Sequence, residues 1–314
     1  MNKNKINWVA VFTMMFLFGM IAFVTNLAAP IGVIWKNQDG INGSGFWGMM
    51  GNMMNFLAYL FMGIPAGKLI TKVGYKKSTL IGVGVGFLGV LVQFLSGKVG
   101  VGSTLAGLPA NFFVYLLGAF VCGFSVCILN TVVNPMLNLL GGGGNRGNQL
   151  VQIGGTFNSL LGTLTPMLVG RFSSSLISGK VSSKMQLGVT SATAIVLVIA
   201  AMFSTSVKTS MPVFTGSGFE MVQVPLTALL LVLCGLCTSV MWGTIFNLAV
   251  EGLGKQSALA SGLFMMMVVG GGIIPLLQNA IADATSYMTS YWILVASLAY
   301  ICWFAFVGSK VKNV

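Results

Sequence analysis

The sequence predicts an all-α, polytopic membrane protein, a bundle of about nine transmembrane helices. Of the 314 residues, 56% are hydrophobic and only 6% are charged, and the mean hydropathy is +0.92. A soluble domain carries about 25% charged residues, so this chain has too few to cover a water-exposed surface. The apolar runs are continuous and recur along the whole chain, which excludes a membrane β-barrel and intrinsic disorder.

Each expected element is an apolar run long enough to cross a bilayer, which takes roughly 20 residues. The first run follows a basic N-terminus and is too long for the core of a signal peptide, so we expect it to stay as a helix. The predicted spans are Trp8–Ile34, Phe46–Gly67, Ser78–Ser96, Leu108–Leu140, Leu150–Ile177, Leu187–Ser206, Val224–Val250, Ala258–Ala282 and Tyr291–Gly308.

The charge pattern separates this chain from several classes of protein. It has 16 basic residues, four acidic residues and no histidine, for a net charge of +12. The bases lie in the gaps between apolar runs, where they act as topology signals, so they do not indicate a nucleic-acid partner. Without histidine and with four carboxylates, most metal sites and acid–base enzymes are excluded. We therefore expect no enzyme activity, no cofactor and no metal.

A lysine-rich stretch between the second and third spans carries the first resemblance to a known family. It runs from Gly67 through Thr71 and Gly74 to Lys76 and Lys77. We expect a tight two-glycine turn on the cytoplasmic side, because it holds four lysines. The stretch resembles the conformational loop between helices two and three of the major facilitator superfamily, usually G-x-x-x-D-R-x-G-R-K. Thr71 stands where the family has an aspartate.

Three further stretches resemble one branch of that superfamily, which holds the fucose permeases and glucose/galactose transporters. They are Asn130–Pro135, Thr156–Ser159 and Thr244–Ala284, in the order of the branch's fourth, fifth, tenth and eleventh helices. The resemblance implies a transporter of a neutral, hexose-like sugar that works by alternating access. It also implies a bacterial inner membrane, with lipid and the sugar as partners. The sequence does not determine the oligomeric state, and a monomer is our expectation.

Near residue 170 the sequence stops resembling one part of the family and starts to resemble a later part. Thr156–Val169 is similar to the family's fifth helix, whereas the residues from Gly170 on are similar to the end of its eighth helix. About three helices are therefore absent relative to the family. We divide the chain into an N-terminal half, residues 1–169 with five spans, and an incomplete C-terminal half, residues 170–314 with about four spans.

This join creates a conflict in topology. The gap at Asn145–Asn148 and the lysines Lys180 and Lys184 are all expected in the cytoplasm. The roughly 30 residues between them can cross the hydrocarbon once but not twice, at about 1.5 Å per residue. Either this segment re-enters, or the helices after it are inverted against the positive-inside rule. The re-entrant arrangement is favoured.

Polar side chains inside the predicted spans are the candidate sugar ligands, because amides both donate and accept hydrogen bonds and an indole can stack on a sugar face. Asn130 and Asn134 lie one turn apart on one helix face. The alternative is that such amides only hold helices together. The candidates are Asn26, Asn130, Asn134, Gln152, Asn158, Trp242, Asn247 and Gln278.

The resemblance also bears on whether sugar transport is coupled to an ion gradient. Asn26 and Asn130 occupy positions where the fucose permease carries acids, and amides take up no proton at neutral pH. We therefore expect facilitated diffusion, or coupling to Na⁺, rather than coupling to protons through those carboxylates. Arg171 is expected at a helix end, so no anionic substrate is inferred. The alternative function is an internally deleted remnant that folds in the membrane without transporting.

Overall fold

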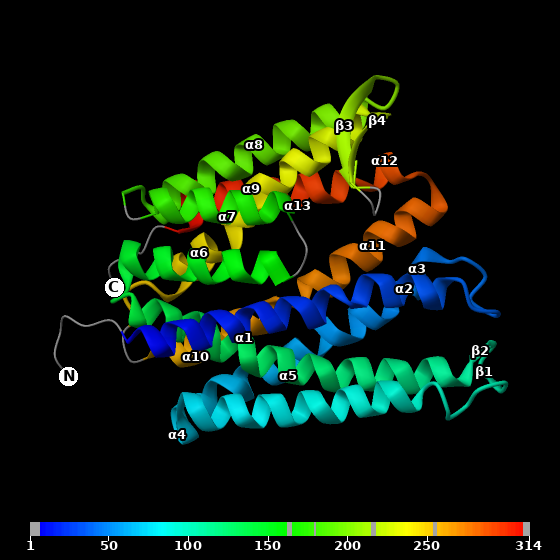
Figure 1. Ribbon diagram of the computed structural model, residues 1–314, viewed down its shortest axis with the longest axis horizontal. Helices are drawn as coiled ribbons and strands as arrows, with labels where there is room; N and C mark the ends of the chain where they lie inside the picture. The colour runs from blue at the N-terminus through cyan, green and yellow to red at the C-terminus, as the bar shows by residue number, and fades with distance from the viewer. Residues whose placement is uncertain (1–6, 162–164, 179, 215–217, 254–255, 310–314) are drawn as a thin grey trace.

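Helices make up most of the molecule, and most of them run along one long axis (Figure 1). The computed structural model describes residues 7–161, 165–178, 180–214, 218–253 and 256–309. The helices are α1 (Trp8–Asn26), α2 (Ala28–Lys36), α3 (Gly45–Gly48), α4 (Met50–Leu95), α5 (Ala110–Leu140), α6 (Gly144–Leu161), α7 (Thr165–Ile177), α8 (Ser183–Phe203), α9 (Leu226–Val250), α10 (Ser257–Met267), α11 (Gly270–Ala284), α12 (Tyr287–Ser290), α13 (Trp292–Trp303) and the π-helix η2 (Phe304–Gly308).

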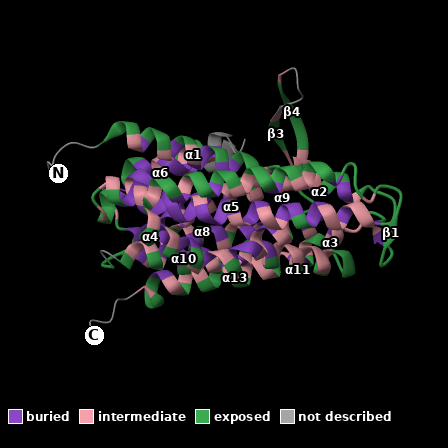
Figure 2. Cartoon of the chain, turned by 90° about the horizontal axis from the view of Figure 1, so that it is seen from below, coloured by how far each residue is buried: buried purple, intermediate pink, exposed green. Residues whose placement is uncertain are grey.

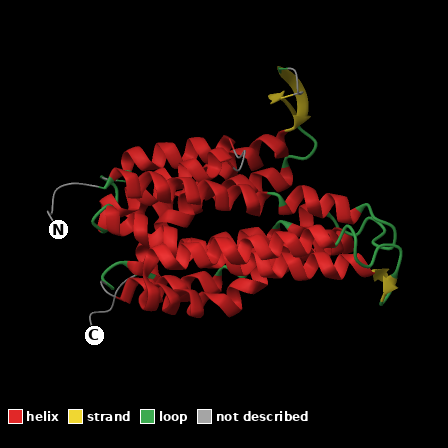
Figure 3. Cartoon of the chain, turned by 60° about the horizontal axis from the view of Figure 1, so that its bottom comes forward, coloured by secondary structure: helices red, strands yellow, loops and turns green. Residues whose placement is uncertain are grey.

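Two small antiparallel hairpins lie outside the bundle. Strand β1 (Thr104–Leu105) pairs with β2 (Leu108–Pro109), and β3 (Lys208–Phe214) pairs with β4 (Phe219–Pro225). Figure 3 shows both at the periphery of the helices. Neither hairpin was predicted from the sequence. Leu108 of β2 is buried in a cluster with Trp35 and Phe112, but both hairpins are short beside the helices, so the all-α class stands.

The outer surface of the bundle is apolar, as a lipid-facing surface must be. Seven helical stretches within the described residues are long and apolar enough to cross a bilayer. Large apolar side chains such as Phe87 and Val196 are exposed on them, while the buried residues lie between the helices (Figure 2). The chain is an integral membrane protein.

The count of seven differs from the predicted nine for two reasons, and the first is visible in α4. Two predicted spans, Phe46–Gly67 and Ser78–Ser96, lie largely within this one 46-residue element. The turn expected over residues 67–77 is instead helical except at Gly74, whose φ is 80° and ψ 168°. The chain reverses there (Figure 1), and a positive φ of this kind favours glycine.

The predicted span Leu150–Ile177 is wrong as a single helix. The structure has two helices, α6 and α7, that pack against each other and run in opposite directions (Figure 1). At about 1.5 Å per residue, α6 is roughly 27 Å long and α7 roughly 20 Å. Their return brings Ser183, at the start of α8, to the same end of the bundle as Asn138, near the end of α5. This reversal is what the re-entrant arrangement requires, and re-entry into the membrane itself stays a prediction.

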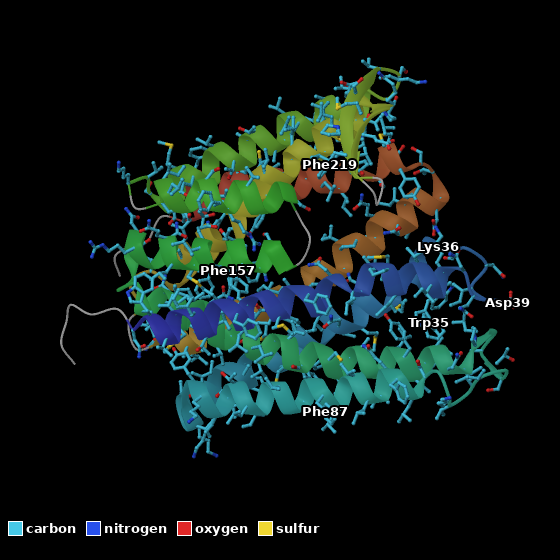
Figure 4. The ribbon with its side chains drawn as sticks, viewed as in Figure 1. Trp35, Lys36, Asp39, Phe87, Phe157 and Phe219 are labelled. Carbon is cyan, nitrogen blue, oxygen red and sulfur yellow. The ribbon has the colours of Figure 1, made fainter. Side chains whose placement is uncertain are left out.

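Basic residues gather at the end of the bundle that holds the Gly74 reversal. Lys72, Lys76 and Lys77 flank the reversal, and α6 and α8 both begin at this end, with Arg146 and Lys184 in their first turns. The opposite end, marked in Figure 4 by Trp35, Lys36 and Asp39, carries charges of both signs, with Lys36, Lys98 and Lys208 beside Asp39, Glu220 and Asp283. By the positive-inside rule, we expect the Gly74 end to face the cytoplasm, and we refer to it below as the cytoplasmic end.

The largest buried cluster joins the N-terminal helices to the C-terminal ones. Val133 and Leu137 of α5 pack there with Phe246 of α9 and Met265 of α10, alongside residues of α1, α4 and α6. A second cluster lies between α8, α9 and α13. The predicted boundary at residue 170 falls inside α7, which packs against both α6 and α9. The division into two halves remains a prediction.

Candidate functional site

Helix α5 presents a buried row of amides toward α4 and α9. Asn130, Asn134 and Asn138 are spaced by four residues, which places them on one face. The Asn130 amide nitrogen donates to the Tyr59 hydroxyl at 2.9 Å, and that of Asn134 donates to the Asn130 carbonyl at 3.0 Å. The Trp242 indole donates to Asn134 Oδ1 at 3.3 Å. These bonds link three helices.

Aromatic rings extend this group of amides. The Trp242 ring meets Phe264 of α10 edge-on, with centroids 5.4 Å apart, and Phe264 meets Phe246 at 5.5 Å. Tyr59, Asn130, Asn134, Trp242 and Phe264 together form what we call the amide–aromatic network. It combines donors, acceptors and ring faces in a water-poor setting, which is the chemistry that recognises an uncharged, hydroxyl-rich solute.

Two further predicted residues lie beside the network on α6. The Gln152 amide donates to the Val240 carbonyl of α9 at 3.0 Å. The Asn158 amide donates to the Phe18 carbonyl of α1 at 2.9 Å. Both side chains therefore tie α6 to its neighbours and point into the bundle rather than toward lipid.

Arg171 lies in the middle of α7, not at a helix end as expected. Its Nη1 donates to the Gly155 carbonyl at 2.7 Å and to Asn158 Oδ1 at 2.9 Å, and its Nε donates to the Ser239 carbonyl at 3.1 Å. All four carboxylates of the chain, Asp39, Glu220, Glu251 and Asp283, are exposed. The guanidinium charge is thus held by carbonyl oxygens rather than by an acid, and it joins α6, α7 and α9.

A third set of bonds closes the cytoplasmic end of the bundle. The Asn138 amide donates to Asn247 Oδ1 at 2.9 Å, and the Asn247 amide donates to Ser183 Oγ at 2.9 Å. All three side chains are buried. We call this contact between α5, α9 and α8 the inner clamp. It places Asn247 one helical turn beyond the amide–aromatic network.

Two predicted site residues, Asn26 and Gln278, form no hydrogen bond to the amide–aromatic network or the inner clamp within the described residues. Asn26, at the end of α1, donates to the Ala22 carbonyl of its own helix at 2.9 Å. Gln278 is half-buried on α11 and makes no side-chain hydrogen bond within the described part of the chain. Their role in binding remains a prediction.

The glycine-rich stretch of α4 packs against α10. A Cβ on Gly67 would lie 3.0 Å from the Ala258 carbonyl oxygen. The closest approach is one turn earlier, where a Cβ on Gly63 would lie 2.5 Å from the Gly262 oxygen, and one on Gly262 2.5 Å from the Gly63 oxygen. Thr71 donates only to the Lys68 carbonyl of its own helix, and Lys76 and Lys77 are exposed.

Sequence reasoning did not find Tyr59, Asn138 or Ser183. Asn138 continues the four-residue spacing of Asn130 and Asn134, so the helical period could have found it. Tyr59 and Ser183 come from other helices, and no spacing in the sequence connects them to their partners. Among the described residues, no group of three or more histidine, cysteine or acidic side chains lies together as metal ligands.

Replacing Asn148 by leucine is expected to stabilise the protein. Asn148 lies on α6 near the cytoplasmic end, its side chain is 0% exposed, and neither its Oδ1 nor its Nδ2 has a hydrogen-bond partner. A buried unpaired polar group costs about 1–3 kcal/mol. Asn148→Leu should therefore raise the melting temperature of the purified protein in detergent by several degrees. A lower melting temperature would mean that a bound water or ion satisfies the amide.

Two cavities accompany these contacts. The larger, of about 390 Å³, lies between α7, α8 and α9 and is lined mainly by apolar side chains, among them Ile177, Met185 and Leu236. The smaller, of about 170 Å³, lies at the opposite end from the inner clamp, between α2, α3 and α11, and Lys36 and Asn279 reach it. Beside it, Asp283 accepts a hydrogen bond from the Phe46 backbone N–H at 3.3 Å.

Comparison with solved structures settles the fold. A crystal structure of the transporter FucP in the outward conformation matches with a TM-score of 0.68 at 16% identity, over 96% of this chain and 100% of the other. The chain has the major facilitator fold. A variant of the E. coli fucose:proton symporter FucP matches equally, with a TM-score of 0.68 at 14% identity. The amide–aromatic network draws its residues from helices on both sides of residue 170.

Curated relatives match over shorter stretches. The glucose/galactose transporter of Brucella abortus biovar 1 (strain 9-941) is 41% identical over 76 residues, which are 24% of this chain and 18% of that protein. A Helicobacter pylori (strain ATCC 700392 / 26695) protein with a provisional glucose/galactose transporter name is 30% identical over 148 residues, 46% of this chain and 32% of that one. The matches thus span less than a third of each relative. No family profile matches the chain.

Proposed function

We propose that this protein carries a neutral hexose across a bacterial inner membrane by alternating access. The observation that carries the proposal is the amide–aromatic network, which joins α4 and α5 to α9 and α10 within a major facilitator fold. The names of the curated relatives, glucose/galactose transporters, support the class of solute. Asn130 and Asn134 would exchange hydrogen bonds with sugar hydroxyls, and Trp242 would stack against a ring face.

The inner clamp supports an outward-facing state. Asn138, Asn247 and Ser183 hold α5, α9 and α8 together at the cytoplasmic end. The matched FucP structure is of an outward conformation, which agrees with a closed cytoplasmic end. Opening toward the cytoplasm would require these bonds to break. The α4–α10 contact at Gly63 and Gly262 would be the surface about which the halves move.

Sugar binding is tested by removing one amide of the network. Asn134→Ala should lower the uptake of labelled glucose or galactose about tenfold in cells that lack their own permeases, since one lost hydrogen bond of about 1.4 kcal/mol is a factor of ten. Gln38→Ala, which removes an exposed amide, is the matched control and should leave uptake unchanged. Unchanged uptake in Asn134→Ala would show that this network does not bind the sugar.

Coupling to protons is not expected, although the matched E. coli protein is a proton symporter. Every carboxylate of this chain is exposed, and the amides Asn26 and Asn130 cannot be protonated at neutral pH. In proteoliposomes, sugar uptake should be the same with and without an inward proton gradient. Accumulation driven by that gradient alone would overturn this part of the proposal. Coupling to Na⁺ through amide and carbonyl oxygens is the remaining coupled mechanism, and an inward Na⁺ gradient tests it.

A non-transporting remnant is the second candidate. It is favoured by the fact that the network residues bond to one another and that the two cavities described above lie elsewhere. In that case neither glucose nor galactose would exchange across proteoliposomes, even with sugar on both sides. Measured exchange of either sugar, abolished in Asn134→Ala, would eliminate the remnant.

A further inference from the structure

The β3–β4 hairpin projects sideways from the bundle. It leaves between the end of α8 and the start of α9 and points across the long axis of the helices (Figures 1 and 2). In the described structure the strands pack mainly on each other and, at their base, against α9. A two-stranded hairpin alone is at best marginally stable in water, so this one needs a surface to lie on.

Both faces of the hairpin are largely apolar. The pairing of Pro212 with Met221 and of Met211 with Val222 places one apolar pair on each face. Met221 is 67% exposed and Val222 38% exposed. A hairpin that lies in water carries polar residues along most of one face, whereas here the polar residues are few on each face, with Ser210 and Gln223 on one and Thr209 and Glu220 on the other. The exposed apolar surface therefore indicates contact with something apolar.

The apolar surface is continuous with the part of the protein that faces lipid. Exposed apolar side chains run along α8 through Val196 to Phe203, which is 77% exposed at the end of that helix, and on to Val207 at the base of β3. Since α8 and α9 span the membrane, the base of the hairpin lies where the hydrocarbon ends. Its sideways direction then keeps it parallel to the membrane surface.

The backbone limits how deep the hairpin can lie. Each strand has one partner, so the outer edges of β3 and β4 expose backbone N–H and C=O groups. Such groups are not tolerated in hydrocarbon, where water is absent. Polar side chains also lie near its base, where Gln223 donates to Ser210 at 2.6 Å beside Lys208. These features suit the headgroup layer, where edges stay hydrated while apolar side chains reach the acyl chains.

We propose that the β3–β4 hairpin lies flat in the lipid headgroup layer on the side of the membrane opposite the inner clamp. One apolar face contacts the upper acyl chains, and Lys208 lies within reach of lipid phosphates. The hairpin thereby acts as an interfacial anchor for the ends of α8 and α9. This inference rests on the membrane location alone and is independent of the solute.

The test is a depth measurement in proteoliposomes. An environment-sensitive fluorophore is attached through Met221→Cys or Val222→Cys, in phosphatidylcholine–phosphatidylglycerol vesicles with nitroxide at the headgroup, at acyl carbon 5 or at carbon 12. Asp39→Cys, in an exposed loop at the same end of the bundle (Figure 4), is the matched control, and the unmutated chain corrects for the five native cysteines. Neither hairpin substitution removes a core contact, so folding is preserved.

The expected result is a blue-shifted label at position 221 or 222 that is quenched at least twofold more by headgroup or carbon-5 nitroxide than by carbon-12 nitroxide. The label at position 39 should show water-like emission. Water-like, unquenched labels at both hairpin positions would overturn the proposal. Efficient disulfide crosslinking of two Met221→Cys chains would also overturn it, because the hairpin would then contact a second copy.

Discussion

Alanine at Gly63 or Gly262 is expected to reduce sugar uptake to background and to lower the melting temperature sharply. The two residues bring α4 and α10 into backbone contact, and each new Cβ would lie 2.5 Å from the other glycine's carbonyl oxygen. A backbone atom cannot rotate away as a side chain can, so the helices must separate. Overpacking of this kind costs about 1–3 kcal/mol. Uptake and thermal unfolding of each purified variant are the measurements.

Gly84→Ala is the matched control for this pair. Gly84 lies in the second arm of the same helix α4, and a Cβ there would meet nothing within 4 Å. Alanine is a better helix former than glycine, so this variant should be as stable as the parent or slightly more so. Equal losses in Gly84→Ala and Gly63→Ala would show that glycine matters through helix flexibility and not through the α4–α10 contact.

Removing the centre of the inner clamp is expected to have the second largest effect. Asn247→Leu leaves both the Asn138 amide and the Ser183 hydroxyl without their partner in a buried site. Each such loss costs about 1–3 kcal/mol. The cytoplasmic end should therefore open more often, and alkylation of Asn148→Cys, a buried position at that end, should be at least tenfold faster in the double variant than in Asn148→Cys alone.

Asn26→Leu serves as the comparison for stability. Its amide bonds only to a carbonyl of its own helix, so its removal leaves no partner on another helix unsatisfied. The melting temperature should fall in Asn247→Leu and stay near the parent value in Asn26→Leu. Unchanged alkylation at position 148 together with unchanged stability in Asn247→Leu would show that the inner clamp does not hold the cytoplasmic end closed.

The sequence could predict the spans that are single apolar runs. The runs at Leu108–Leu140 and Val224–Val250 agree with α5 and α9 to within two residues, because a continuous apolar run in a membrane protein has one stable form. The apolar run at Leu150–Ile177 did not by itself reveal its reversal, which was indicated only by the charged residues on either side of it. Its hydrophobicity is the same whether the chain crosses once or turns back, and the difference comes from packing of α7 against α6 and α9.

The candidate site was predictable only along single helices. Asn130 and Asn134 share a face of α5 by their spacing, and the structure places both in the network. Their partners Tyr59 and Trp242 come from α4 and α9, so that pairing depends on tertiary packing that no periodicity encodes. Arg171 illustrates the same limit, since its three acceptors come from α6 and α9.

The reversal in α4 has a mechanical consequence. A single residue, Gly74, separates an arm that contacts α10 through Gly63 from an arm that contacts α5, where Gly86 faces Ser125 and Gly89 faces Cys122. With only Gly74 between the two arms, the end of the first arm and the start of the second stay side by side. A straight helix of 46 residues would measure about 69 Å, more than twice the hydrocarbon thickness. That one positive-φ glycine therefore lets a 46-residue element fit within the membrane and ties the adjoining ends of both arms to one depth.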